Sequence, residues 1–248
     1  MNNLIALTSR ELKAFWYSSI AYAVGAMFLF LQGFVFWLLI RAMSDPSADP
    51  TWTIAQVFYG GTFFYWFSAM ILAPLLTMRS FSEEKRTGSI ELLLTAPVTD
   101  AQVVLAKFLG AWIAYCLLWA STLGFFGVIR LFAPLDWAQI LIGYLGTCLL
   151  GAVLTSLGVL ASSLTRNQVI AAVLSFVAVL LCFSIGILEA FFRDPESQKI
   201  IQYLSLMEHL RDFSKGILDT RPVVFYVSVT SIVLFLTGRV VGHPKWRS

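Results

Sequence analysis

Hydrophobic residues fill six long stretches of the chain that contain no Asp, Glu, Lys or Arg. The stretches cover residues 14–40, 50–78, 108–129, 137–165, 167–188 and 222–238. A membrane-spanning helix needs about 20 mostly apolar residues, and the last stretch is short but workable if its flanking side chains reach the interface. We therefore predict an all-α polytopic membrane protein with six transmembrane helices. The predicted spans are 17–41, 53–78, 100–130, 137–164, 167–189 and 221–241.

Residues 3–16 carry a different pattern, in which apolar and charged positions take opposite faces of a helix. The polar face holds Arg10, Glu11 and Lys13. Thr8 followed by Glu11 fits a capping box, which favours a helix start there. We predict an amphipathic helix that lies in the membrane interface. The alternative is a frayed basic tail.

Residues 79–98 form the connection between the second and third spans. A charged cluster in its first half contains Glu83, Glu84, Lys85 and Arg86. Ser80 and Glu83 fit a capping box that would open a helix, Gly88 permits a turn, and Pro97 stops the segment. Thr99 begins a further capping box at the start of the third span. Charge combined with an apolar patch favours a docking surface, and the alternative is a solvated loop that only sets topology.

Residues 194–218 form the connection before the last span. Asp194 is suited to cap a helix that has Pro195 in its first position. Apolar residues then recur at helical spacing. We predict one or two outer amphipathic helices, which either cover the mouth of a pathway or have no gating role.

The composition agrees with a membrane protein. Of the 248 residues, 58% are hydrophobic and 12% are charged, and the charged share is about half that of a soluble domain. The net charge of +3 is too weak to indicate nucleic-acid binding. With six spans and the N-terminus inside, ten of the 17 Lys and Arg residues lie on the inner side. This bias predicts that both termini are cytoplasmic.

The chain lacks the motifs of a catalyst. It contains no phosphate loop, no nucleophile elbow and no HExxH helix, and its Cys and His residues are not spaced as metal ligands. We therefore expect a non-catalytic chain with no metal, no cofactor and no ATP site of its own. The polar candidates for lining a pathway are Gln32, Gln56, Ser68 and Ser175. For the aromatic stretch over 58–67, an interfacial belt is favoured over a substrate surface.

Residues 78–112 resemble the hallmark segment of type-2 ABC transporter permeases, the ABC-2 family. The matching positions are Glu84, Lys85, Gly88, Ser89, Ile90, Glu91, Leu93, Leu94, Pro97 and Val98. The interfacial helix and the six spans extend the resemblance over nearly the whole chain, as a single transmembrane domain covering 1–248. Residues 211–221 resemble the corresponding region of the gliding-motility-associated branch of this family.

The resemblance implies the permease half of an exporter in the bacterial cytoplasmic (inner) membrane. It implies a second permease subunit, identical or related, surrounding lipid, and a separate cytoplasmic ATPase that binds ATP and Mg. A periplasmic accessory protein is a further possible partner. The implied coupling residues are Ser80, Glu83, Glu84, Lys85, Arg86, Gly88, Glu91 and Pro97. Charged pairs would link them to Arg10, Glu11 or Lys13, and Arg166 and Asn167 would form a second, smaller contact. The alternative is a non-transporting scaffold that tethers an ATPase or secretion or motility machinery.

Overall fold

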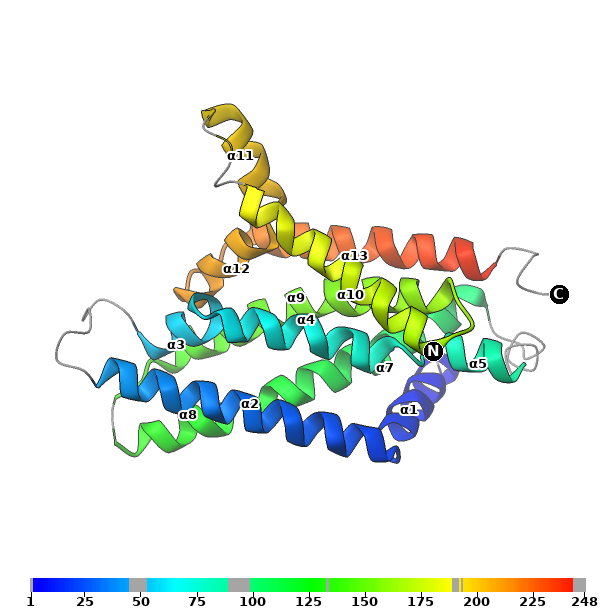
Figure 1. Ribbon diagram of the computed structural model, residues 1–248, viewed down its shortest axis with the longest axis horizontal. Coiled ribbons are helices and arrows are strands. Elements are labelled where there is room, and N and C mark those ends of the chain that lie inside the picture. Colours follow the sequence, from blue (N-terminus) through cyan, green and yellow to red (C-terminus); the bar gives the residue numbers. More distant parts are fainter. Residues whose placement is uncertain are drawn as a thin grey trace.

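Long helices run between the two ends of the molecule, and short helices lie at both ends (Figure 1). The computed structural model describes residues 2–44, 53–88, 99–132, 134–188, 192 and 194–242. Its helices are α1 (Asn2–Trp16), α2 (Ser19–Met43), α3 (Ile54–Gln56), the π-helix η1 (Val57–Gly61), α4 (Phe63–Thr77), α5 (Ser82–Thr87), α7 (Asp100–Ser121), α8 (Leu123–Arg130), α9 (Trp137–Ser163), α10 (Gln168–Leu188), α11 (Pro195–Leu204), α12 (Leu206–Ser214) and α13 (Thr220–Val241). These residues form helices and no strands, which confirms the predicted all-α class.

Five helical segments are long and apolar enough to cross a membrane. They are Ser19–Met43, Asp100–Arg130, Trp137–Ser163, Gln168–Leu188 and Thr220–Val241. A sixth crossing exists if the two helical pieces on either side of Thr62 are counted as one span. Among the described residues the chain is therefore an all-α polytopic membrane protein with five or six spans.

The second predicted span differs from a continuous helix. Its two pieces meet at an angle of 44°. Thr62 has an extended backbone, and its hydroxyl accepts a hydrogen bond from the Tyr65 amide at 3.4 Å, so a new helix begins there. The hydropathy of the stretch carries no information about this break, because apolar residues continue across it.

Helix α9 lies at the centre of the bundle and contacts α4, α7, α10, α12 and α13. Four of its glycines face a side chain of a neighbouring element so closely that an added Cβ would come within 3 Å of it. The pairs are Gly143 with Tyr59, Gly146 with Phe213, Gly151 with Tyr115, and Gly158 with Thr77. Small residues let helices approach closely when hydrophobic burial cannot drive association within lipid.

Aromatic rings fill the space beside α9. The Trp119 ring centroid lies 4.8 Å from that of Tyr65 and 5.1 Å from that of Phe28. The expected interfacial belt over 58–67 is therefore wrong for four of its seven aromatic residues: Phe58, Tyr59, Tyr65 and Trp66 are buried, whereas Phe63, Phe64 and Phe67 are exposed. The break at Thr62 allows this division, because it changes the direction of the helix within the stretch.

The sequence predicts one or two helices in the connection before the last span. The structure has two there, α11 and α12. The Asp194 carboxylate accepts a hydrogen bond from the Ser197 amide at 3.1 Å, as expected for the cap of α11. Helix α11 extends away from the bundle (Figure 1), while α12 packs against η1 and α9.

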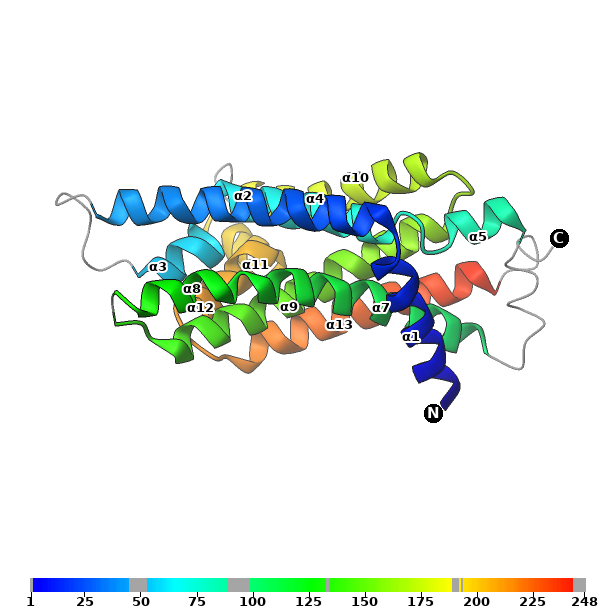
Figure 2. The same ribbon diagram turned by 90° about the horizontal axis from the view of Figure 1, so that it is seen from below.

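The short elements divide between the two ends of the bundle. Helices α1 and α5 and the last turns of α13 lie at one end, and α3, α8 and α12 lie at the other (Figures 1 and 2). Val241, at the end of α13, joins Phe81 in a small apolar cluster beside α5. The site described next is built at this end.

The dependence of helix packing on the close glycine contacts of α9 can be tested by substitution. Changing Gly151→Ala places a Cβ 2.2 Å from the Tyr115 ring, and overpacking of this kind costs about 1–3 kcal/mol. The free energy of unfolding of the purified protein in detergent should fall accordingly. Gly127→Ala in α8 is the matched control, because no atom lies within 4 Å of its added Cβ. Equal unfolding temperatures for the two variants would show that the stability of the bundle does not depend on the close approach of Tyr115 to α9.

Candidate functional site

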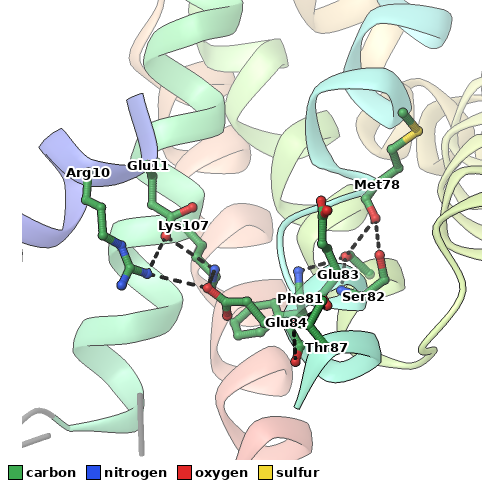
Figure 3. A network of polar contacts seen from close by, with 10 residues as sticks. Arg10, Glu11, Met78, Phe81, Ser82, Glu83, Glu84, Thr87 and Lys107 are labelled. Atoms are coloured by element: carbon green, nitrogen blue, oxygen red, sulfur yellow. Dashed lines mark hydrogen bonds and ion pairs between the residues drawn. The ribbon is translucent and has the colours of Figure 1, made fainter. Parts of the chain in front are cut away.

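Four charged side chains from three helices meet at this end of the bundle, and we call them the four-charge cluster (Figure 3). Lys107 of α7 lies 2.8 Å from Glu84 of α5 and 3.3 Å from Glu11 of α1. Arg10 lies 2.9 Å from Glu11 and 3.4 Å from Glu84. Each carboxylate thus contacts both cations. The cluster balances its own charge and ties α1, α5 and α7 together.

Lys107 is the buried member of the four-charge cluster. Its side chain is 2% exposed, whereas those of Glu11 and Glu84 are 21% and 20% exposed. Its ammonium also lies 5.2 Å from the centroid of the Phe81 ring. A charge taken out of water must be paired to be tolerated. The position of Lys107 therefore requires both carboxylates beside it.

Close packing of α1 on α7 brings Glu11 to Lys107. An added Cβ on Gly110 would lie 2.8 Å from the Cβ of Glu11, so α1 crosses α7 at this glycine. The capping box predicted at Thr8 and Glu11 is wrong, because α1 continues through Thr8. The Thr8 hydroxyl donates to the Leu4 carbonyl within the helix at 2.9 Å, and Glu11 is used in the four-charge cluster instead.

A serine of α9 holds the start of α5. The capping box predicted at Ser80 and Glu83 is wrong: α5 begins at Ser82, and no side chain caps it locally. The Ser162 hydroxyl instead accepts hydrogen bonds from the amides of Phe81 and Ser82 at 3.0 and 3.1 Å. The same hydroxyl donates to the Met78 carbonyl at 3.2 Å. The first turn of α5 is thus fixed to the end of α9.

Lys85 makes a second attachment to α9. It is buried, and its ammonium donates to the carbonyl of Ser163, the last residue of α9. Burial lowers the pKa of Lys85 to about 8, with a further contribution from the positive charge of Arg166. Helix α10, which begins just after Arg166, contacts α5. Asn167 accepts a hydrogen bond from the Val169 amide at 2.9 Å and so caps α10.

The two faces of α5 differ in what they contact. Glu84 and Lys85 point into the protein and hold α5 in place. Arg86 is exposed, and the Glu83 side chain is 42% exposed and lies 4.0 Å from Arg79. Gly88 ends the helix with a φ of +73°, a conformation that glycine adopts without strain.

The other predicted coupling residues differ in their exposure and in the elements that carry them. Ser80 is half-buried in the connection between α4 and α5. Lys13 is exposed and forms no ion pair with the rest of the described chain. Arg166 and Asn167 are exposed next to α5. Glu91 and Pro97, with the remainder of 89–98, lie outside the described residues.

The four candidates for lining a pathway differ in their surroundings. Gln32, Ser68 and Ser175 are buried inside the chain. Gln56 exchanges hydrogen bonds with Thr53 at the start of α3, in a capping box that holds this short helix. A role for any of them in a pathway stays a prediction. Within the described ranges no group of His, Cys, Asp or Glu is arranged to hold a metal ion.

Sequence reasoning missed Lys107, Ser162 and Ser163 as parts of the site. Lys107 carried a usable signal, since it is the one charged residue between Asp100 and Arg130 and an isolated charge near a span requires a partner. The two serines carried none. Their importance depends on which backbone groups lie opposite them in space.

Removal of the buried cation tests the four-charge cluster. Lys107→Met leaves two carboxylates to share Arg10, and we expect a loss of about 3 kcal/mol in the free energy of unfolding. Amide hydrogen exchange should become faster in α1 and α5 in particular. Arg86→Met serves as the control, because this arginine is exposed and outside the cluster. If exchange in α1 and α5 is the same in both variants, the cluster does not hold these helices.

One family of known proteins accounts for nearly the whole chain. Residues 6–242 match the family described as ABC-2 family transporter protein. No curated protein matches the chain at a significant level. The matched region contains every part of the site described above. The chain is therefore an integral membrane protein that belongs to the ABC-2 transporter family.

Proposed function

We propose that this chain is the permease subunit of an ATP-driven transporter and that α5 is where a separate ATPase subunit contacts it. One observation carries the proposal: α5 is a short charged helix, fixed at the end of the bundle, with Glu83 and Arg86 left accessible. These two residues are three positions apart and so lie on the same side of the helix. A complementary partner surface would meet both.

The attachments of α5 give it the properties of a coupling element. A push on α5 reaches α4 through the four-residue connection 78–81, α7 through Lys107, and α9 through Ser162 and the Ser163 carbonyl. In the proposed mechanism the ATPase closes on ATP and Mg, which it alone binds. Its motion then displaces α5 and the spans attached to it, and the pathway between two permease subunits opens outward, as in an exporter.

The orientation follows from charge. We place α1, α5 and the end of α13 on the cytoplasmic side of the bacterial inner membrane, supported by the ten Lys and Arg residues that this orientation assigns to the inner side. A second permease subunit, identical or related, completes the pathway.

We further assign the chain to the gliding-motility-associated branch of the family. The support is the similarity of residues 211–221, which cover the end of α12 and the start of α13. These residues lie at the end of the bundle opposite α5 (Figure 1), the side on which a periplasmic accessory protein would bind.

Charge reversal on α5 tests the contact with an ATPase. In the double variant Glu83→Lys with Arg86→Glu the net charge is unchanged but the pattern offered to a partner is inverted. We expect the ATPase that co-purifies with the chain to bind about tenfold more weakly and to lose its stimulation.

Arg130→Glu is the matched control, since this exposed arginine ends α8 at the opposite end of the bundle. All variants should unfold at the same temperature as the unmodified protein. If the double variant retains full ATPase binding and stimulation, α5 is not the contact.

A second experiment separates a transporter from the alternative, a scaffold that tethers an ATPase. Cysteines placed at the exposed positions Phe63 and Phe67 of α4 report on the distance between two subunits in the membrane. In a transporter the yield of intersubunit crosslinks should differ between ATP-bound and nucleotide-free complexes. A yield that is independent of nucleotide, measured while ATP is being hydrolysed, would favour the scaffold.

A further inference from the structure

A cavity of about 700 Å³ lies between α1, the first turn of α2, the end of α4, the start of α5 and α7. This volume is in the range of sites that hold a small molecule. The four-charge cluster forms part of its wall. The cavity therefore lies at the boundary between the apolar spans and the charged end of the bundle.

The wall of the cavity has an apolar part and a charged part. The apolar part includes Phe15, Ile20, Ala21, Leu75 and Leu76. The charged part contains three cations and three carboxylates, namely Arg10, Arg79, Lys107, Glu11, Glu83 and Glu84. A wall of this kind suits an amphiphile whose polar end carries both signs of charge.

Two buried polar atoms of the wall lack hydrogen-bond partners within the described part of the chain. Arg79 Nε is one, and the nearest carboxylate oxygen, on Glu83, is 4.0 Å away. Glu84 Oε2 is the other, because Lys107 and Arg10 contact only Oε1. A buried polar group without a partner is costly, so a ligand that supplies one acceptor and one donor gains affinity from both.

We propose that this cavity binds a phospholipid with a phosphoethanolamine headgroup. The phosphate accepts a hydrogen bond from Arg79 Nε, the ammonium donates to Glu84 Oε2, and the apolar wall contacts the upper part of the acyl chains. Phosphatidylglycerol is disfavoured because the three cations and three carboxylates of the wall already balance, and because its headgroup offers Glu84 only neutral hydroxyl donors in place of an ammonium. A choline lipid is disfavoured because its quaternary ammonium has no N–H to donate.

A lipid bound here also contacts both α1 and α5. Because it binds the folded chain, it stabilises the arrangement in which α5 is held at the end of the bundle. This inference concerns the permease chain alone and does not depend on whether an ATPase contacts α5.

The test is a lipid titration of the purified, delipidated full chain followed by native mass spectrometry. Phosphatidylethanolamine, phosphatidylcholine and phosphatidylglycerol with identical acyl chains are compared. We expect one phosphatidylethanolamine to bind with a Kd about tenfold lower than the Kd of either other lipid. Equal Kd values for the three lipids would overturn the proposal.

Two variants locate the bound lipid. Arg79→Met removes the Nε donor to the phosphate and should raise the Kd of phosphatidylethanolamine about tenfold. Ala14→Phe fills the cavity without changing any charge and should abolish the tight site. Arg86→Met is the matched control and should bind as the unmodified chain does, because Arg86 does not line the cavity.

Unfolding temperatures measured in detergent show whether each variant is folded. The two cavity variants are independent tests, because one removes a polar group and the other adds a bulky side chain. If both are folded and bind phosphatidylethanolamine as the unmodified chain does, the lipid is not in this cavity. Glycerophosphoethanolamine, which has no acyl chains, should not compete. Competition by it at equal concentration would show that the apolar wall contributes nothing and would also overturn the proposal.

Discussion

The buried charge of Lys107 is the constraint on which the end of the bundle that carries α1 and α5 depends. An ammonium with a 2% exposed side chain needs carboxylates at hydrogen-bonding distance, and Glu84 and Glu11 provide them. Those two residues belong to α5 and α1, so satisfying one charge places two peripheral helices against α7. The side chains on the outer face of α5 then have a defined position. A partner that pushes on them acts on the spans and not on a loop.

The centre of the bundle and this site are parts of one structure because both depend on α9. Its glycines allow Tyr115 and Thr77 to approach closely, which brings α7 and α4 against it. Its last turn supplies the Ser162 hydroxyl and the Ser163 carbonyl that fix α5. Movement of α5 relative to α9 must therefore break specific hydrogen bonds. This is the physical basis for expecting discrete conformations of the end of the bundle rather than continuous bending.

Local sequence signals succeeded where the interacting groups are close in sequence and have no competing partner. The capping box at Thr99 and Gln102 is formed with both hydrogen bonds, and Asp194 caps α11. The same kind of signal failed at Ser80 because Ser162, 81 residues beyond Phe81, satisfies the backbone donors at the start of α5. It failed at Thr8 because packing against α7 extends α1 on both sides of that residue. In both failures a contact between distant segments outweighed a weak local preference.

The sequence by itself determined that the chain is an all-α membrane protein with several spans and that the charged segment after the second predicted span is distinctive. Hydropathy and short motifs are properties of contiguous residues, so they can be read without the fold. Only the tertiary structure decided how the charges of that segment are used. Glu84 and Lys85 are turned inward to Lys107 and Ser163, whereas Glu83 and Arg86 stay accessible. Adjacent residues on a six-residue helix differ in this way because their partners come from α7 and α9, and no local pattern records which face those helices cover.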